Sequence, residues 1–359
     1  MSLGLTRTDL DSLPNYVPGR SPVDLARELG LPEAIKLASN EVPYGPLPGV
    51  AEAVAAAVAV THRYPDMGVL ELRAVLARRL GVDAERIVTG CGSVALCEHL
   101  VRAACLPGDE VVYSWRSFEA YPIIAATTAA SSRRVPNTAT HGHDLPAMAA
   151  AITGQTRIVL VCNPNNPTGT SVRRAELDRF LDTVPNDVLV VLDEAYREFV
   201  TDDQVPDGLA AYGDRPNVVV LRTLSKAWGL AGLRVGYLVA HPEVAAAVRK
   251  VATPFGTSAL AQAAALAALD QGDEVRRRCD LVIAERSRVT ETLRKLVPEV
   301  PESQANFVWL PLGERAAAFG AVCESRGVIV RPFPGDGVRV TIGTPTENDA
   351  FLVAAESAL

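Results

Sequence analysis

The segment 223–237, T-L-S-K-A-W-G-L-A-G-L-R-V-G-Y, holds residue types that together suit covalent chemistry. Its one lysine, Lys226, has mostly apolar neighbours, and burial of a lysine lowers its pKa and frees the amine to act as a nucleophile. The hydroxyls of Thr223 and Ser225 and the guanidinium of Arg234 are typical ligands of a phosphate. Together these groups suit a phosphorylated aldehyde, with which the amine would form a Schiff base. The alternative is a lysine at a strand end whose amine reaches solvent.

Polar residues follow three predicted strands. N-P-N-N-P-T-G, at 163–169, follows one apolar strand, D-E-A-Y, at 193–196, follows the next, and Lys226 follows a third. Strands and helices alternate along this part of the chain, which predicts an α/β fold with a mainly parallel sheet and helices on both faces. Because ligands of such sheets bind at the carboxyl ends of the strands, we expect these polar groups to share one site.

Asp193 follows a run of valines and leucines, and a buried carboxylate is costly unless a cation pairs with it. A protonated pyridine nitrogen would be a fitting partner, because the pair would keep the ring able to accept electrons. The alternative role for Asp193 is a helix or turn cap. Tyr196 and Asn166 could hydrogen-bond a phenolic oxygen of such a ring. Phe118 could stack on the ring face or serve as a core aromatic.

A glycine turn, G-C-G-S-V-A at 90–95, precedes an apolar helix. Free backbone amides and the positive end of the helix dipole would make this turn a phosphate cradle, although many such turns use glycine only for geometry.

Hydrophobic periodicity and turn residues predict the remaining elements. Helices are expected at 50–59, 70–80, 96–104, 175–184, 242–251, 259–269, 274–296, 316–324 and from 347 onward, and strands at 82–89, 110–113, 157–162, 188–192, 218–221, 235–239, 306–310, 328–331 and 338–342. Thr346 and Asp349 form a plausible capping box for the last helix. The predicted organisation is an N-terminal arm and substrate-site segment at 1–45, a large domain at 46–256 and a small C-terminal α+β domain at 257–359.

Composition excludes several classes of protein. The chain has 359 residues, 48% of them hydrophobic, and a formal net charge of -7, which argues against a nucleic-acid partner. Neither a membrane-spanning apolar run nor a secretory signal is seen, so we expect a cytoplasmic protein without a membrane partner. Six cysteines without a C-x-x-C pair are expected to be buried thiols, and the scattered histidines predict no metal site.

The three polar motifs, with these separations, resemble those of the fold type I aminotransferases that use pyridoxal 5′-phosphate (PLP). The resemblance is closest to the histidinol-phosphate aminotransferase branch and runs from Lys36 to Gly343. It implies the PLP-dependent transferase fold, a large PLP-binding domain, and an amino acid and a 2-oxo acid as substrates. It also implies an obligate homodimer, in which Tyr64 of the R-Y-P segment reaches the phosphate of the other subunit.

The resemblance assigns roles to individual residues. Lys226 would form the Schiff base and then move the proton, Asp193 would pair with the pyridinium, and Phe118 would stack on the ring. Tyr196 and Asn166 would bind the ring oxygen. The phosphate would be surrounded by Gly92, Ser93, Val94, Thr223, Ser225 and Arg234. The substrate α-carboxylate would be bound by Arg339, with Arg331 and Asn40 as second candidates; for both arginines the alternative is an exposed strand charge.

Two positions depart from the histidinol-phosphate branch. Val94 and Phe255 stand where that branch usually has polar groups that hold the substrate's end and its phosphate. An apolar wall binds a phosphate poorly and an aromatic ring well, so we expect an aromatic amino acid such as phenylalanine as donor and 2-oxoglutarate as acceptor. The chain also closely resembles the actinobacterial-type aminotransferases that act on aromatic amino acids such as phenylalanine, and this resemblance implies the same substrate. Tyr16 and Tyr121 could line either kind of pocket.

Other activities remain as alternatives. These are a histidinol-phosphate aminotransferase, a PLP-dependent lyase or decarboxylase on the same fold, and a non-catalytic ligand-binding regulator. A nicotinamide-dependent dehydrogenase is poorly supported, because no G-x-G-x-x-G motif follows the first strand.

Overall fold

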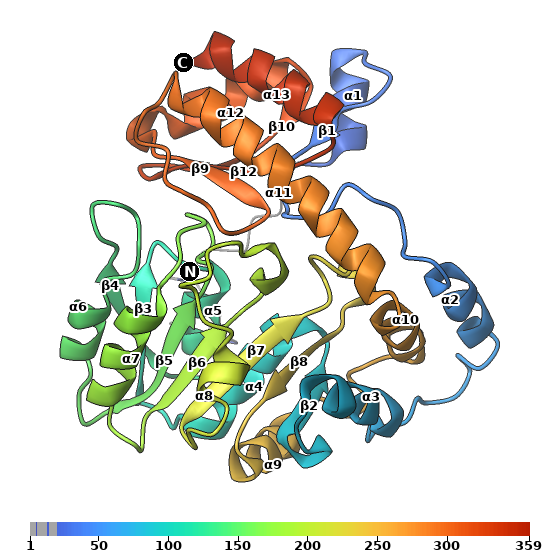
Figure 1. Ribbon diagram of the computed structural model, residues 1–359, viewed down its shortest axis with the longest axis vertical. Helices are drawn as coiled ribbons and strands as arrows, with labels where there is room; N and C mark the ends of the chain where they lie inside the picture. The colour runs from blue at the N-terminus through green and yellow to red at the C-terminus, as the bar shows by residue number, and fades with distance from the viewer. Residues whose placement is uncertain (1–4, 6–12, 14–19) are drawn as a thin grey trace.

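A seven-stranded sheet forms the centre of the computed structural model, which describes residues 5, 13 and 20–359 (Figure 1). Tyr16 lies outside the described residues. The strand order is β2-β8-β7-β6-β5-β3-β4, and β8 alone runs antiparallel to its neighbours, so the predicted mainly parallel sheet is confirmed. The strands are β2 (Ile87–Gly90), β3 (Glu110–Trp115), β4 (Ser131–Pro136), β5 (Thr156–Cys162), β6 (Leu189–Asp193), β7 (Val218–Thr223) and β8 (Gly236–Val239).

Helices cover both faces of this sheet (Figure 1). In β5, Ile158 and Leu160 pack into one apolar cluster with α4, α5 and α9, whereas Val159 and Val161 pack into another with α6, α7 and α8. Successive side chains of a strand point to opposite faces, so a continuous apolar run is buried on both sides. These helices are α4 (Gly92–Ala104), α5 (Ala120–Thr127), α6 (Leu145–Ala150), α7 (Arg174–Thr183), α8 (Gly208–Tyr212) and α9 (Pro242–Val251).

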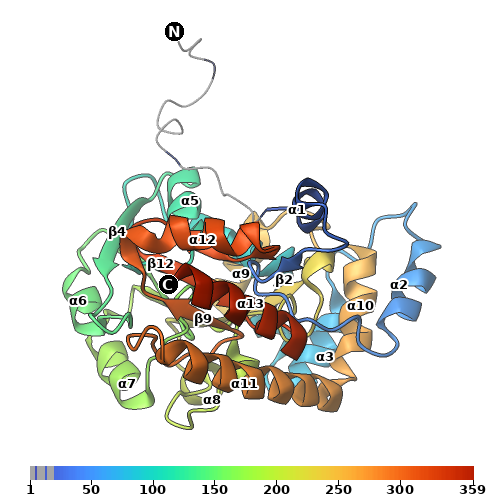
Figure 2. The ribbon, with the colours of Figure 1, turned by 90° about the horizontal axis from the view of Figure 1, so that it is seen from above.

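A second, antiparallel sheet of order β11-β12-β9 lies above the central sheet in Figure 1. Helices α12 and α13 cover it on the side away from the central sheet, as Figures 1 and 2 show. The strands of this sheet are β9 (Phe307–Leu310), β11 (Arg331–Phe333) and β12 (Gly337–Thr341). The helices of this part of the chain are α11 (Gly272–Arg294), α12 (Ala316–Ser325) and α13 (Pro345–Ala358). This sheet supplies two arginines, Arg331 and Arg339, of the site described below.

The segment before residue 40 packs with the C-terminal part of the chain. Strand β1 (Ile35–Lys36) pairs in parallel with β10 (Val328–Ile329), and α1 (Pro22–Leu29) buries Leu25 beside them. In contrast, α10 (Ala259–Leu269) packs on α2 (Val50–Val58) and α3 (Leu70–Leu80), beside the central sheet (Figure 1). The predicted division at 45 and 256 therefore stays a prediction.

Several local predictions differ from the structure. The capping box of α13 is formed by Thr344 and Glu347, because the helix begins at Pro345, two residues before the predicted start. The predicted strand 328–331 divides between two sheets, as β10 and β11. Of the six cysteines, five are buried as expected, but Cys91 is exposed at the start of α4.

Short 3-10 turns complete the elements: η2 (Ala84–Arg86), η3 (Arg197–Phe199), η4 (Ala231–Leu233) and η5 (Gly313–Arg315). No helix in the described part of the chain is both long and apolar enough to cross a membrane.

Candidate active site

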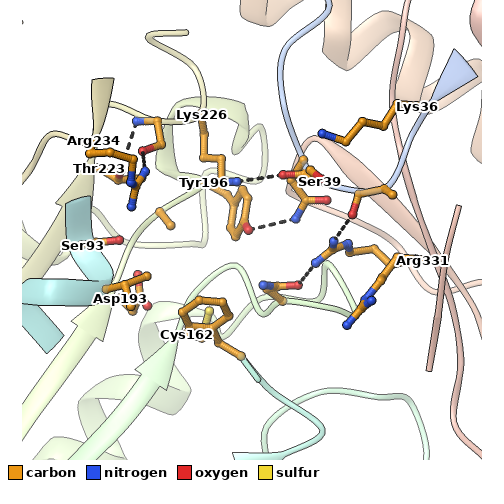
Figure 3. Close-up of a pocket in the computed structure, with 18 residues that line it drawn as sticks. Lys36, Ser39, Ser93, Cys162, Asp193, Tyr196, Thr223, Lys226, Arg234 and Arg331 are labelled. Atoms are coloured by element: carbon orange, nitrogen blue, oxygen red, sulfur yellow. Dashed lines mark hydrogen bonds between the residues drawn. The ribbon is translucent and has the colours of Figure 1, made fainter. Parts of the chain in front are cut away.

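A cavity of about 280 Å³ opens at the carboxyl ends of β5, β6 and β7 (Figure 3). It brings together most of the residues that the sequence predicted for the site. Those that line it are Asn40, Ser93, Val94, Phe118, Asn166, Asp193, Tyr196, Thr223, Ser225, Lys226, Arg234, Arg331 and Arg339. Sequence reasoning missed Lys36, Ala38, Ser39, Cys162 and Ala195, which also line it. Position was the available signal for both Cys162 and Ala195, since Cys162 ends the predicted strand 157–162 and Ala195 lies in the D-E-A-Y motif that follows the next strand.

Lys226 projects into the cavity from the loop after β7 (Figure 3). Its Nζ donates to the Ser39 carbonyl at 3.0 Å and lies 6.0 Å from the Tyr196 ring centroid. Burial first, and then the nearby Arg339 guanidinium, lower the pKa of Lys226 to about 7. A large fraction of the amine is therefore neutral near pH 7 and able to attack a carbonyl carbon.

An anion cradle lies on one side of the cavity, where Figure 3 places Arg234, Thr223 and Ser93 together. The Arg234 Nη1 donates to Ser225 Oγ at 3.2 Å, beside the amino-terminal turn of α4. Gly92 begins that helix with a φ of 76°, and a Cβ there would overlap the Arg234 guanidinium. Glycine is thus required for the close approach of arginine to the helix start, which is the setting that binds a phosphate.

Asp193 ends β6 and lines the cavity. Its Oδ2 accepts a hydrogen bond from the Tyr121 hydroxyl at 2.8 Å, and its Oδ1 is buried without a hydrogen-bond partner among the described residues. Burial raises the pKa of Asp193 to about 6, against the lowering effect of the Tyr121 hydrogen bond. The free oxygen of a buried carboxylate suits an N–H cation in the cavity.

Hydrogen bonds join the two sheets across the cavity. Arg339, buried on β12, donates through Nη1 to Asn166 Oδ1 and through Nη2 to the Ala38 carbonyl, both at 2.6 Å. The Asn40 Nδ2 donates to the Tyr196 hydroxyl at 2.9 Å. Burial also raises the pKa of Tyr196, so its phenol stays protonated. The Asn166 amide is thereby oriented by Arg339 of the small sheet, and the Tyr196 phenol by Asn40 of the loop after β1.

Among the predicted site residues that the structure describes, four do not line this cavity. Gly92 lies behind Arg234. Tyr121 was expected to bind the substrate, but it is buried beneath Asp193 and does not line the cavity. Tyr64 and Phe255 stack on each other with ring centroids 4.5 Å apart, and the Tyr64 residue is 81% exposed. No group of three or more His, Cys, Asp or Glu residues in the described ranges is placed to hold a metal ion.

Comparison with known proteins identifies the class of protein that has this fold and site. The chain belongs to the family of class I and II aminotransferases, whose family model matches residues 32–355. The chain is 57% identical to an aromatic amino acid aminotransferase of Streptomyces avermitilis and 58% identical to one of Streptomyces coelicolor, with 98% of this chain and 96% of each relative covered. The resemblance to fold type I aminotransferases is confirmed.

Solved structures agree with this family. A histidinol-phosphate aminotransferase from Sinorhizobium meliloti, in complex with pyridoxal-5′-phosphate, superposes with a TM-score of 0.88 at 29% identity, with 99% of this chain and 98% of that one covered. An L-threonine-O-3-phosphate decarboxylase from Porphyromonas gingivalis superposes with a TM-score of 0.75 at 25% identity, with 90% of this chain and 98% of that one covered.

Proposed function

We propose that the protein is a PLP-dependent aminotransferase that moves the amino group of an aromatic L-amino acid to 2-oxoglutarate. The class of reaction is that of its family. The substrate proposal rests on Val94, whose apolar side chain lines the cavity on the first turn of α4 and offers no hydrogen bond to a phosphate. The names of the relatives from the two Streptomyces species support it.

The site fits PLP by the chemistry of its donors. The unpartnered Asp193 Oδ1 matches a pyridinium N–H, and the Arg234 cradle matches a phosphate. Tyr196 and Asn166 would hydrogen-bond the ring oxygen, and Phe118 would stack on the ring. When bound, the cofactor supplies an aldehyde and an electron-accepting ring.

The chain's own residues perform the remaining tasks. Lys226 would carry the proton between the substrate α-carbon and the cofactor, which its lowered pKa suits at neutral pH. Arg339 would bind the substrate α-carboxylate through its fork of N–H groups. Because Arg339 and Lys226 both line the cavity, carboxylate binding would place the α-carbon beside the amine. The cytoplasmic location expected from the sequence stays a prediction.

A paired kinetic assay tests the substrate, with 2-oxoglutarate as acceptor and with phenylalanine or histidinol phosphate as donor. We expect kcat/KM to be larger for phenylalanine, by about tenfold or more, because the Val94 side chain can pack on an aromatic ring and donates no hydrogen bond to a phosphate. A larger kcat/KM for histidinol phosphate would refute the substrate proposal and would favour the activity of the Sinorhizobium relative.

The exposed aromatic pair of Tyr64 and Phe255 supports a homodimer. Met67 and Leu70 are exposed near Tyr64 in the chain, and an exposed apolar surface of this kind typically marks an interface. We propose that a second copy covers this surface and that Tyr64 reaches the phosphate cradle of its partner.

Subunit complementation tests this arrangement. Tyr64→Ala and Lys226→Ala should each be impaired, but a mixed dimer contains one site with both native residues. Activity recovered on unfolding and refolding the two variants together would support the shared site. Equal activity in mixed and unmixed samples would contradict it.

Tyr121 is expected to position Asp193 rather than to bind substrate. Tyr121→Phe removes the hydroxyl that donates to Asp193 Oδ2, so the carboxylate loses its one side-chain donor at 2.8 Å. We expect PLP affinity of the apoenzyme to fall about tenfold, as is typical for a hydrogen bond to a charged group. A fluorescence titration of the apoenzyme with PLP measures this.

Tyr212→Phe is a matched control for Tyr121→Phe. The buried Tyr212 also donates its hydroxyl to an aspartate, Asp178, at 2.7 Å, but neither residue lines the cavity. PLP affinity should therefore be unchanged in Tyr212→Phe. An equal loss in both variants would mean that a general loss of stability, and not the orientation of Asp193, lowers the affinity.

A further inference from the structure

Two arginines project side by side into the cavity from neighbouring strands. Arg331 on β11 and Arg339 on β12 are directly opposite in the antiparallel register, and both line the cavity. Both guanidinium groups also lie against the Phe333 ring, at 5.5 Å and 5.9 Å from its centroid. Like charges directly opposite on one sheet face repel each other, so the second arginine needs a counter-charge.

Glu119 supplies that counter-charge from the other sheet's domain. The Arg331 Nη2 donates to its two carboxylate oxygens at 3.0 Å and 3.3 Å. The side chains of Arg331 and Glu119 are only 14% and 29% exposed, so solvent screens the pair weakly. Glu119 immediately follows Phe118 and precedes α5, whereas Arg331 comes from the small sheet. Arg331 lies on the side of the cavity opposite the Arg234 cradle (Figure 3), and Glu119, which is outside the cavity lining, pairs with it there.

We propose that Glu119 is a specificity-determining residue. It is an internal counter-ion that pairs with Arg331 when the bound substrate has a neutral side chain, and a substrate with an acidic side chain displaces it. The proposal rests on the proposed function, in which one cavity takes an aromatic donor and a dicarboxylic acceptor in turn. Both substrates place an α-carboxylate at Arg339. Besides the amino or oxo group on the α-carbon, they differ in the distal group, which would face Arg331.

An aromatic ring leaves the ion pair intact. The planar guanidinium of Arg331 already lies against the Phe333 ring, and a substrate ring can pack on the same group while Glu119 keeps its charge balanced. A distal carboxylate instead offers Arg331 the charge that Glu119 provides. Binding then exchanges one ion pair for another, and the competing Glu119 reduces the affinity for acids.

The other cation–carboxylate pair at the cavity is less suited to this role. Lys36 contacts Glu41 at 3.0 Å, but the Glu41 side chain is 46% exposed and the pair is therefore better screened. Lys36 also presents a single ammonium rather than a fork, so it matches a carboxylate less well. Arg331 remains the stronger receptor for a distal acid.

Binding of two unreactive acids to the PLP-loaded enzyme tests the proposal. Glutarate has two carboxylates, and 3-phenylpropionate replaces one of them by a phenyl ring. Glu119→Gln should tighten glutarate about fivefold, the value of a partly screened ion pair, and should leave 3-phenylpropionate within about twofold. Calorimetry gives both dissociation constants without turnover. A failure of the proposed function would appear instead in the wild-type assay with phenylalanine.

Two further variants separate the counter-ion role from other effects. Asp336→Asn removes the same charge from the turn after β11, where Asp336 pairs with Arg116, a residue outside the cavity lining. It should leave both dissociation constants unchanged. Arg331→Met should weaken glutarate binding, and Glu119→Gln added to it should give no further tightening.

Three outcomes would overturn the proposal. Weaker glutarate binding in Glu119→Gln would mean that Glu119 only orients Arg331. Equal shifts for both acids would mean that it does not discriminate between them. Equal tightening in Asp336→Asn would mean that net charge alone governs the affinity.

Discussion

Lys226→Ala should lower the rate of amino-group transfer by at least about 10³-fold while the chain stays folded, because both the nucleophile and the proton carrier are lost. The amine is placed for both roles. It is buried in the cavity, its pKa is lowered to about 7, and its hydrogen bond goes to a backbone carbonyl rather than to a carboxylate. Steady-state assays with phenylalanine and 2-oxoglutarate measure the loss.

The covalent role of Lys226 has a separate readout. Borohydride reduction of the loaded wild-type enzyme should fix PLP on the peptide that contains Lys226, as peptide mass spectrometry would show. Lys36 is an internal control, because it is the other lysine that lines the cavity and should stay unlabelled. Labelling of Lys36 in the wild type, or a Lys226→Ala variant with native activity, would contradict the assignment.

The substitution should not unfold the apoenzyme. The pKa of Lys226 lies below its ordinary value of 10.5, so the unfolded chain holds a proton that the native chain releases between about pH 7 and 10.5. Stability therefore rises with pH across that window, and below it the buried charge costs stability in full. Removing the amine relieves this cost, so thermal unfolding near pH 7 should show no loss of stability in Lys226→Ala.

Local sequence signals located the centre of the site well. Thr223, Ser225, Lys226 and Arg234 lie within twelve residues of one another, and the ends of β5 and β6 bring Asn166 and Asp193 beside them. A parallel sheet aligns the carboxyl ends of its strands, so apolar runs followed by polar residues were sufficient to predict a shared site.

Contacts between distant segments were not predictable in this way. The Tyr121–Asp193 hydrogen bond joins residues 72 apart in the chain, and the Arg331–Glu119 pair joins residues 212 apart. Hydrophobic periodicity describes one helix or strand at a time, so it does not indicate which distant residue a side chain will contact. Tyr121 in particular was expected to line the substrate pocket; the α5 helix instead directs Tyr121 beneath Asp193.

Elements at the edge of the fold were missed for a different reason. β4, S-S-R-R-V-P, is the edge strand of the central sheet, and of its residues only Val135 is buried. An edge strand needs little apolar surface, so it gives no hydrophobic run to detect.

The start of α13 was placed two residues late, since Thr346 and Asp349 have the same spacing as the actual cap, Thr344 and Glu347.

Asp193→Asn should weaken PLP binding by at least about 10²-fold and yet make the apoenzyme more stable at pH 7. The first effect follows because the neutral amide cannot balance a buried pyridinium, and breaking a buried ion pair is strongly unfavourable. Asparagine keeps the shape of aspartate and can still accept the Tyr121 hydroxyl, so the loss reports charge rather than packing. Equilibrium dialysis of the two apoenzymes against PLP at pH 8 measures it.

The second effect follows from the raised pKa of Asp193. Its pKa of about 6 in the native chain exceeds its ordinary value of 3.8, so between these pH values the native chain holds a proton that the unfolded chain has released. Stability of the wild-type apoenzyme therefore falls as pH rises from about 4 to 6 and is then level, with a total cost on the order of 3 kcal/mol. The Asp193→Asn variant has no carboxyl group at this position, so its stability does not carry this pH-dependent cost.

The difference in unfolding free energy between the variant and the wild-type apoenzyme should thus be near zero at pH 4, grow up to about pH 6 and stay constant above it. Urea unfolding of both apoenzymes at a series of pH values tests this shape. A gap that is independent of pH would show that Asp193 is not buried as a charge. If the shape is found together with the loss of PLP affinity, the apoenzyme keeps a costly carboxylate at β6 because the cofactor needs it, and cofactor binding offsets that cost.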